Sequence, residues 1–388
     1  MTKVVEKIFI IGRILKHEKE GLAVAVYKDN ELVVDLWGGY AERSALRPWE
    51  EDTLTFGFST TKFTAALIVA ILVTQGRMKY EDKVTKYWSE FGRNGKEDIT
   101  IQCIVEHKAG LIKFDGELEL KDGNNYNLIS KLIEDTRPVW PPGTKVGYHV
   151  LTYGWLIDQI VRRVDVKNRG VVDFFKEEIY PLAADKDYFI GLPRSEHYRL
   201  ARLVQPSRRE ILRAFIHNPI YVKSGIMNIF QSCRCYGLLD VAGNYPPWLS
   251  TVKSELPYNN PKVQQIENLS VSGFGTARGF ASVVSAILQN NLISQEVWEV
   301  LQKPTELVTD SVAKVRCYRG YGFFYDVHPT KEKAFLLSHT GFGGQKIIVD
   351  PYSKTVVVLF RNAIEWDLRK EKLTDNIMKK VLLLDGGS

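Results

Sequence analysis

The chain has 388 residues, of which 45% are apolar and 25% are charged. This length leaves room for two packed lobes, and the ordinary composition excludes a disordered or fibrous protein. The net charge of +6 comes from 52 basic and 46 acidic residues that are interleaved along the chain; without a basic stripe or a recognisable module, we expect no nucleic-acid partner.

The first strongly apolar run of the chain covers residues 8–11 and is flanked closely by Lys7 and Arg13. It is far shorter than a signal-peptide core or a membrane span, so we expect a cytoplasmic protein without a transmembrane segment. Apolar residues recur at roughly helical spacing in the same region, at Val4, Val5, Ile8, Ile11 and Ile14. The region is therefore predicted to form a first amphipathic helix that packs on the body.

Two short β-rich runs follow, over residues 21–27 and 31–37. They are separated by Lys28-Asp29-Asn30, which has the composition of a turn, and Gly38-Gly39 follows the second run. This pattern predicts a β-hairpin.

Residues 60–75 are apolar on nearly every side, and Gly76 follows them at the position of a helix stop. The pattern predicts a helix that is buried all round. Ser59 lies at its N-terminus with Lys62 three residues on, so helical geometry places both side chains on one face. Free backbone N–H groups and the positive end of the helix dipole favour an oxyanion at such a serine. Ser59 is therefore a candidate nucleophile.

Ser-x-x-Lys is a short pattern, and helix capping by Ser59 is the structural alternative. The pattern also occurs at residues 250–253 and 311–314. Ser250 follows Pro-Pro-Trp, and Ser311 lies in a polar stretch that could simply cap a helix. Because neither opens a buried apolar helix, Ser59 is the favoured candidate.

A loop that starts at Pro141-Pro142-Gly143 leads to Tyr148. The residues after it, 149–164, supply the apolar face of a predicted helix. Tyr148 is thus expected at a loop-to-helix junction, as a second chemically useful group downstream of Ser59.

The cysteines and histidines give no metal pattern. Four cysteines are too few for a disulfide framework and are predicted to be reduced: Cys103, Cys233, Cys235 and Cys317. Cys233 and Cys235 have no second Cys or His pair nearby, so structural thiols are favoured over a zinc site. Five of the seven histidines are scattered over the chain after residue 100, at His107, His149, His217, His328 and His339. We therefore expect no metal and no cofactor, and we interpret His107 and His217 as structural.

The C-terminal part is predicted to contain three strands, over residues 334–344, 346–350 and 355–362, and a last helix over 364–384. The first strand becomes glycine-rich after His339-Thr340-Gly341. Glycines there let the backbone approach a ligand closely.

These motifs, in this order, resemble those of the serine β-lactamase-like family, in particular class C β-lactamases, family VIII carboxylesterases and animal β-lactamase-domain proteins. The resemblance covers nearly the whole chain, through Trp37–Gly39, Phe58–Lys62, Glu106–Leu111, Tyr148–Gly154, Gly275–Gly279 and His339–Gly341. It implies an α+β fold, an α/β sandwich with an antiparallel sheet plus a mostly helical lobe. The implied lobes are residues 1–76 with 270–388 and residues 77–269, which form one catalytic unit with Ser59 in the cleft.

The resemblance also implies roles for single residues. Ser59 would be acylated, and Lys62 and Tyr148 would together take its proton and return one to the leaving group. The backbone N–H groups of Ser59 and Phe342 would form the oxyanion hole, beside the substrate-binding residues His339, Thr340 and Gly341. Either a phenolate or a neutral lysine can activate a serine, so the identity of the base stays open.

Two positions depart from the family pattern. The chain has Tyr148-His149-Val150 where β-lactamases have Tyr-x-Asn, and His339 where they have a lysine. In that family, the asparagine and the lysine that this chain lacks contact the amide and the carboxylate of β-lactams. An imidazole with a pKa of about 6.5 is mostly neutral at cytosolic pH, so His339 is expected to favour neutral esters. The alternative is that His339 is only a packed strand residue.

We therefore expect a serine hydrolase, esterase-like more than β-lactamase-like, whose substrate is a small-molecule or peptide ester or amide. The alternative is a catalytically idle scaffold of the same fold that binds a partner or polymerises, because a fold does not fix a function. A homo-oligomer is compatible with either interpretation.

Overall fold

The structure is a computed structural model, and it describes residues 20–207 and 256–364 together with residues 209, 246, 248, 249, 375, 378, 379 and 382. Several predicted features lie outside the described residues: the first helix, His217, Cys233, Cys235, Ser250 and most of the last helix. Among the described residues, no helix is long and apolar enough to cross a membrane.

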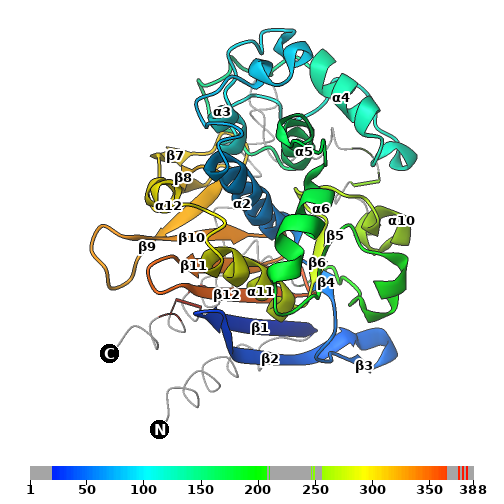
Figure 1. Cartoon of the computed structure of the whole chain (residues 1–388). Coiled ribbons are helices and arrows are strands. Elements are labelled where there is room, and N and C mark those ends of the chain that lie inside the picture. Colours follow the sequence, from blue (N-terminus) through cyan, green and yellow to red (C-terminus); the bar gives the residue numbers. More distant parts are fainter. Residues whose placement is uncertain are drawn as a thin grey trace.

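Within the described ranges, nine antiparallel strands form one large sheet in the order β3-β2-β1-β12-β11-β10-β9-β8-β7 (Figure 1). Their bounds are β1 (Gly21–Lys28), β2 (Glu31–Glu42), β3 (Arg47–Pro48), β7 (Glu306–Thr309), β8 (Arg316–Gly320), β9 (Phe323–Val327), β10 (Phe335–Thr340), β11 (Lys346–Asp350) and β12 (Thr355–Arg361). The register places Val24 of β1 opposite Leu359 of β12. Segments far apart in the sequence therefore share one sheet.

The predicted hairpin is confirmed as β1 and β2, which pair antiparallel. Its turn places Asp29 and Asn30 in the left-handed region, with φ of 48° and 65°, a conformation that these residue types tolerate. The three C-terminal strands are confirmed as β10, β11 and β12. Strands β7 and β8 extend the sheet beyond the strands predicted from the sequence, because their charged, half-exposed residues carry little strand signal.

The buried helix predicted after Ser59 is confirmed as α2 (Thr61–Thr74), whose residues from Thr61 to Leu72 are all buried. It ends before Gly76, which has a φ of 68°. A 3-10 turn, η2 (Phe58–Thr60), precedes the helix and carries Ser59. Figure 1 shows α2 running from the sheet toward the helices α3, α4 and α5.

The other α-helices of the described residues are α3 (Ile101–Val105), α4 (Tyr126–Asp135), α5 (Thr152–Val164), α6 (Val171–Phe174), α10 (Pro261–Gln264), α11 (Ala277–Gln289) and α12 (Gln295–Leu301). A second small sheet has the order β4-β6-β5, from β4 (Thr55–Phe56), β6 (Gly273–Gly275) and β5 (Tyr188–Ile190). The remaining short helical turns are η1 (Arg43–Ala45), η3 (Val84–Lys86), η4 (Ser89–Gly92), η5 (Leu120–Asp122), η6 (Phe175–Ile179, a π-turn), η7 (Tyr180–Leu182), η8 (Arg194–Arg199) and η9 (Pro257–Asn259).

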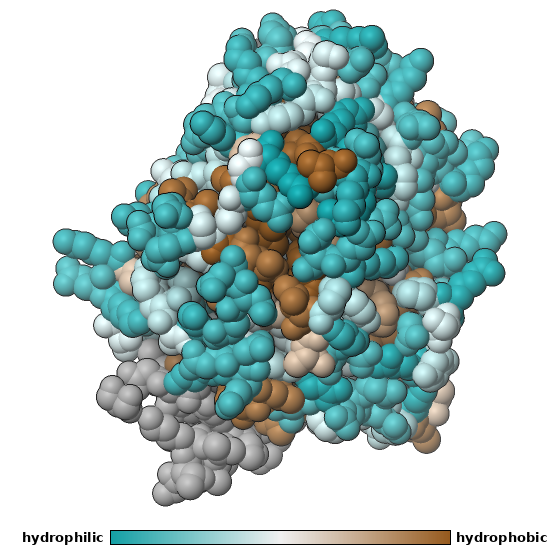
Figure 2. Space-filling model, viewed as in Figure 1, coloured by the Kyte–Doolittle hydropathy of each residue, from teal (hydrophilic) through white to brown (hydrophobic). Residues whose placement is uncertain are grey.

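Helix α11 packs against β1 and β12, whereas α2 contacts both β10 and α5. An antiparallel sheet with helices packed against it is an α+β fold, as predicted. Figure 2 shows hydrophilic side chains over most of one face, with apolar side chains gathered near its middle. The division into lobes at residues 76 and 270 stays a prediction.

Candidate active site

Ser59 lies in a turn that the backbone holds in an uncommon conformation. The preceding residue, Phe58, has a φ of 46°, which costs conformational energy for a residue with a large side chain. Two hydroxyl groups fix the turn: Thr60 Oγ1 donates to the Gly57 carbonyl at 2.8 Å, and Thr61 Oγ1 donates to the Phe58 carbonyl at 2.5 Å. Ser59 is therefore presented in one orientation directly before a long helix.

Lys62 lies one helical turn further on and is completely buried. Its Nζ is 3.3 Å from Ser59 Oγ and donates hydrogen bonds to the carbonyl oxygens of Val150 at 2.7 Å and Ser270 at 2.9 Å. No acidic side chain of the described residues forms an ion pair with this amine. Burial without a counter-charge lowers the pKa of Lys62 well below its ordinary value of 10.5.

Tyr148 precedes α5, as predicted, although the helix begins at Thr152 and not at residue 149. The Lys62 side-chain nitrogen is 4.8 Å from the centroid of the Tyr148 ring, and the phenol forms a hydrogen bond with Ser59. Burial raises the pKa of Tyr148 above 10, and the Ser59 hydrogen bond and the Arg319 charge offset only part of this rise. The structure thus brings Ser59, Lys62 and Tyr148 together.

The segment after β10 lies against the Ser59 turn. A Cβ atom on Gly341 would be 2.5 Å from the carbonyl oxygen of Gly57, so only a glycine allows this close approach. The ring of the next residue, Phe342, packs edge-on against Phe58 with centroids 5.7 Å apart. The Phe342 N–H donates a hydrogen bond to none of the groups that the structure describes, whereas the Gly341 N–H donates to Gln345 at 2.7 Å.

His339 is buried in β10, with 1% of its surface exposed, and Thr340 ends the same strand. The imidazole Nδ1 is 3.0 Å from the Thr340 carbonyl oxygen, and the ring lies 4.7 Å from Phe324 and 6.3 Å from Tyr148. Burial, and then the charge of Lys62, lower the pKa of His339 well below 6.5. The expectation that His339 has the unperturbed pKa of about 6.5 is therefore wrong. Its imidazole stays neutral at lower pH as well.

Two further histidines adjoin Tyr148, although the sequence showed them only as scattered residues. His107 Nδ1 accepts a hydrogen bond from the His149 N–H at 3.1 Å, and the His107 ring is 4.9 Å from the Tyr148 ring. His149 Nδ1 donates to Gly147 at 2.7 Å, and its Nε2 accepts from Leu111 at 3.0 Å. Burial lowers the pKa of His107 well below 6.5 and that of His149 to about 3.

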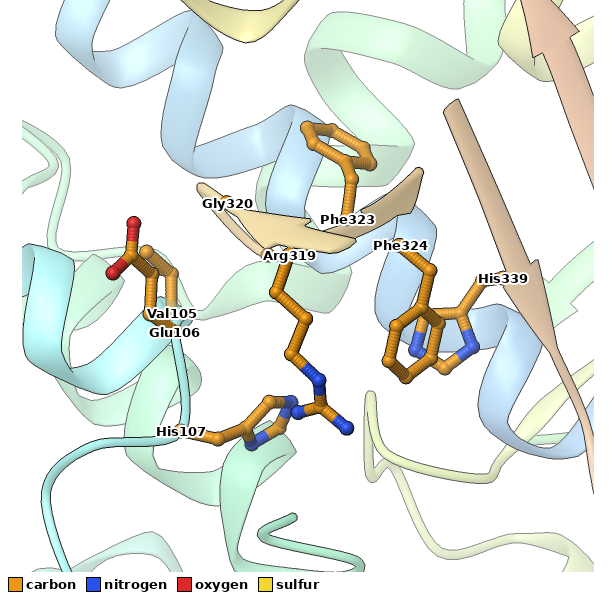
Figure 3. Close-up of a pocket in the computed structure, with 9 residues that line it drawn as sticks. Val105, Glu106, His107, Arg319, Gly320, Phe323, Phe324 and His339 are labelled. Carbon is orange, nitrogen blue, oxygen red and sulfur yellow. The ribbon is translucent and has the colours of Figure 1, made fainter. Parts of the chain in front are cut away.

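A cavity of about 10 Å³, enough for one water molecule, lies beside these groups (Figure 3). It is lined by Val105, Glu106, His107, Arg319, Gly320, Gly322, Phe323, Phe324 and His339. Figure 3 shows the Arg319 side chain extending toward the His107 ring, with Phe324 and His339 on its other side. No pattern in the sequence indicated Arg319, because a single arginine in a strand has no motif.

The other Ser-x-x-Lys candidate within the described ranges does not resemble Ser59. Ser311 lies in the loop between β7 and β8, where its N–H donates to the Val146 carbonyl at 2.8 Å, and it opens no helix. Among the described residues, no group of three or more histidine, cysteine, aspartate or glutamate side chains is placed to hold a metal ion.

Comparison with known proteins gives consistent matches. The family model described as Beta-lactamase matches residues 10–380. The chain is 34% identical over 275 residues to the esterase/beta-lactamase LipL of Mycobacterium tuberculosis, a match that covers 69% of this chain and 58% of LipL. The chain thus spans little more than half the length of that relative. It is also 35% identical over 95 residues, 24% of each chain, to the esterase EstB of Burkholderia gladioli.

Solved structures match over almost the full length. A penicillin-binding protein homologue from Caulobacter crescentus is 26% identical with a TM-score of 0.75, and the match covers 95% of both chains. A family VIII carboxylesterase is 23% identical with a TM-score of 0.76, over 97% of this chain and 96% of the other.

Proposed function

The chain belongs to the beta-lactamase family of serine hydrolases, and from this premise we propose that it hydrolyses carboxylic esters through an acyl-enzyme at Ser59. The observation that carries the proposal is the contact of 3.3 Å between Ser59 Oγ and the nitrogen of a completely buried lysine. The name of the relative EstB, an esterase, supports an ester over a β-lactam, whereas the name of LipL includes both activities. The departures at Val150 and His339 also support an ester.

The surroundings of Lys62 favour a neutral amine as the base. Because burial lowers the pKa of Lys62 and raises that of Tyr148, the neutral amine with a neutral phenol is favoured over the ammonium with a phenolate. A neutral amine has two N–H groups, which the Val150 and Ser270 carbonyls accept. Its lone pair is then free to face Ser59 Oγ and accept the hydroxyl proton.

In the proposed reaction, Ser59 Oγ attacks the ester carbonyl carbon while its proton passes to Lys62. The carbonyl oxygen becomes an oxyanion, stabilised by the N–H groups of Ser59 and Phe342. The intermediate collapses by breaking the bond to the alcohol oxygen, which takes a proton from Tyr148, and Tyr148 is reprotonated by Lys62. Water then attacks the carbonyl carbon of the acyl-Ser59 ester while its proton passes to the Lys62–Tyr148 unit. The second intermediate collapses by breaking the bond between this carbon and Ser59 Oγ, which takes a proton back from the same unit, so that the carboxylic acid leaves and Ser59 is restored.

The pH dependence follows from this role. An amine accepts a proton only when it is unprotonated, so kcat/KM rises with pH across the apparent pKa of the coupled Lys62–Tyr148 unit. Since burial lowers the pKa of Lys62, this rise is complete well below pH 10.5.

We expect a fluorophosphonate to label Ser59, because an activated serine next to a base attacks the phosphorus. Intact mass spectrometry with peptide mapping would locate the adduct, and Ser59→Ala should remain unlabelled. Ser311→Ala is the matched control and should label like the wild type, because Ser311 lies in the loop between β7 and β8 and opens no helix. An adduct at another serine would contradict the assignment, and a folded wild type that neither labels nor turns over esters would favour the idle scaffold.

The neutral surroundings of His339 predict the charge of the preferred substrate. Because His339 stays uncharged and Arg319 is paired with Asp310, the described site offers a substrate carboxylate no free cation beside Ser59. We expect His339→Lys to raise kcat/KM for a carboxylate-bearing ester, relative to its neutral analogue, by about tenfold, or about 1.4 kcal/mol.

The wild-type preference ratio should not change between pH 7.5 and 6, since burial keeps His339 neutral throughout. His339→Gln, which keeps a polar neutral side chain, is the control and should leave the ratio near that of the wild type. A wild-type ratio that rises at pH 6, or a His339→Lys variant with an unchanged ratio, would exclude this account of specificity.

A further inference from the structure

Arg319 is a buried cation next to Tyr148 that the proposed reaction does not use. Its side chain, in β8, is 4% exposed, and its Nη2 is 2.8 Å from Asp310 Oδ2, which is fully buried. Its Nε donates to Cys317 Sγ at 3.2 Å, whereas Nη1 has no hydrogen-bond partner among the described residues, and the residue lines the small cavity. The guanidinium lies 4.6 Å from the ring centroid of Phe324 and 5.7 Å from that of Tyr148.

Asp310 connects this arginine to the backbone of Tyr148. Its Oδ1 accepts three backbone N–H groups, from Tyr148 at 3.2 Å, Val312 at 2.8 Å and Ala313 at 2.6 Å. The neighbouring Ser311 N–H donates to the Val146 carbonyl at 2.8 Å. The loop between β7 and β8 therefore holds the tyrosine loop at two points, and Arg319 adds a contact with the face of the ring.

Few charges surround Tyr148. Among the described residues, the titratable groups packed near it are Lys62 of α2, Tyr153 of α5, His107, His149, His339 of β10, Arg319 of β8 and Asp310, with Glu106 at the cavity wall. Burial raises the pKa of Tyr153, so this phenol is uncharged. Burial keeps the three histidines neutral, and Glu106 forms an ion pair with Lys108 at 2.7 Å. Apart from Lys62, the charges in the described part of the chain that act on the phenol are therefore those of Arg319 and Asp310.

We propose that Arg319 and Asp310 are a charge-balanced positioning pair, which holds Tyr148 against Ser59 and Lys62 and sets the pH range in which the proton is transferred. The inference rests on the proposed role of Tyr148 and deepens it. Asp310 fixes the backbone of the tyrosine, and Arg319 fixes its ring and favours release of its proton. Because the two charges are opposite and adjacent, each offsets the effect of the other on the site.

The two single substitutions should move the pH profile in opposite directions. Arg319→Met removes a positive charge, so both the Lys62 ammonium and the Tyr148 phenol hold their protons more tightly. The acid limb of the pH profile, over which kcat/KM rises with pH, then moves to higher pH by about one unit. At a pH below the limb, this shift lowers kcat/KM about tenfold. Asp310→Asn keeps an oxygen for the three N–H groups but exposes the site to the uncompensated Arg319 charge. The acid limb then moves to lower pH.

Two further variants separate charge from structure. Arg319→Met combined with Asp310→Asn restores the net charge and should return the limb close to its wild-type position, which a merely structural role would not do. Arg319→Lys keeps the charge and should keep the wild-type limb. Arg278→Met is the matched control: this arginine is also paired with carboxylates, those of Asp35, Glu51 and Asp185, but not beside Tyr148, so the limb should not move.

Thermal unfolding identifies any variant that fails to fold. The remaining variants still decide the question, because Asp310→Asn should move the limb to lower pH whereas Arg319→Lys should leave it in place. Limbs that stay at the wild-type position in all folded variants would overturn the inference while leaving the proposed function intact. Shifts that are undiminished in the residual activity of a Tyr148→Phe background would also overturn it, since the pair would then act on Lys62 alone and not through Tyr148. A Tyr148→Phe enzyme with full activity would instead refute the proposed role of Tyr148.

Discussion

Lys62→Met should lower kcat for ester hydrolysis by about 10²–10⁴-fold, the range expected when a general base is lost. Tyr148→Phe should cause a loss of similar size, because without the hydroxyl the proton cannot reach the leaving group. The two side chains lie side by side, with the Lys62 nitrogen 4.8 Å from the Tyr148 ring, and are proposed to handle one proton. The double variant should therefore lose little more than either single variant.

Steady-state kinetics on an activated neutral ester would measure this cycle, with circular dichroism to confirm that each variant is folded. Lys96→Met is a suitable control, because Lys96 is also completely buried and also donates to two carbonyl oxygens, those of Glu134 and Thr136, away from Ser59. It should leave kcat near the wild-type value. Losses that multiply in the double variant would show that Lys62 and Tyr148 act in separate steps.

Phe342→Pro should lower kcat by about 10²–10³-fold, because proline has no N–H to donate to the oxyanion. The N–H of Phe342 is suited to this role, since it donates to none of the described groups and its segment lies against the Ser59 turn. The expected loss should appear in kcat more than in KM, because the charge on the oxygen develops only in the transition state.

Phe342→Ala is the matched variant, since it removes the ring but keeps the N–H. It should lose the edge-on contact with Phe58 and retain most of kcat. Equal losses in the alanine and proline variants would show that the ring, and not the backbone donor, carries the effect. Fluorophosphonate labelling rates provide a second measurement, because the phosphoryl oxygen would occupy the same position.

Local sequence patterns were sufficient for the elements that position Ser59. The two β-rich runs in residues 21–37 and the turn residues between them predicted β1 and β2, and the unbroken apolar run after Ser59 predicted α2. Boundaries were less accurate: the helix after Tyr148 begins three residues later than expected, because residues 149–151 use their backbone to anchor the loop. The roles of Ser59, Lys62 and Tyr148 stay predictions until they are tested.

The features that the sequence could not provide depend on tertiary contacts. Arg319 and Asp310 are far from Tyr148 in the chain, and only the sheet brings the β7–β8 loop to the tyrosine loop. The pKa of His339 was misjudged because an imidazole in a strand looks the same in the sequence whether it is buried or exposed. Its environment depends on Phe324 of the neighbouring strand β9, which covers one face of the ring.

The order of strands in the large sheet has a consequence for biosynthesis. β1 pairs with β2 on one side and β12 on the other, so the N-terminal hairpin cannot join the remaining strands until residues 355–361 have been synthesised. The Ser59 turn follows that hairpin, whereas the Phe342 donor follows β10, which is connected to β1 only through β11 and β12. Closing so long a loop is slow. A ribosome-bound chain that ends before β12 should therefore be unreactive toward fluorophosphonates even though Ser59 and Lys62 have long since emerged.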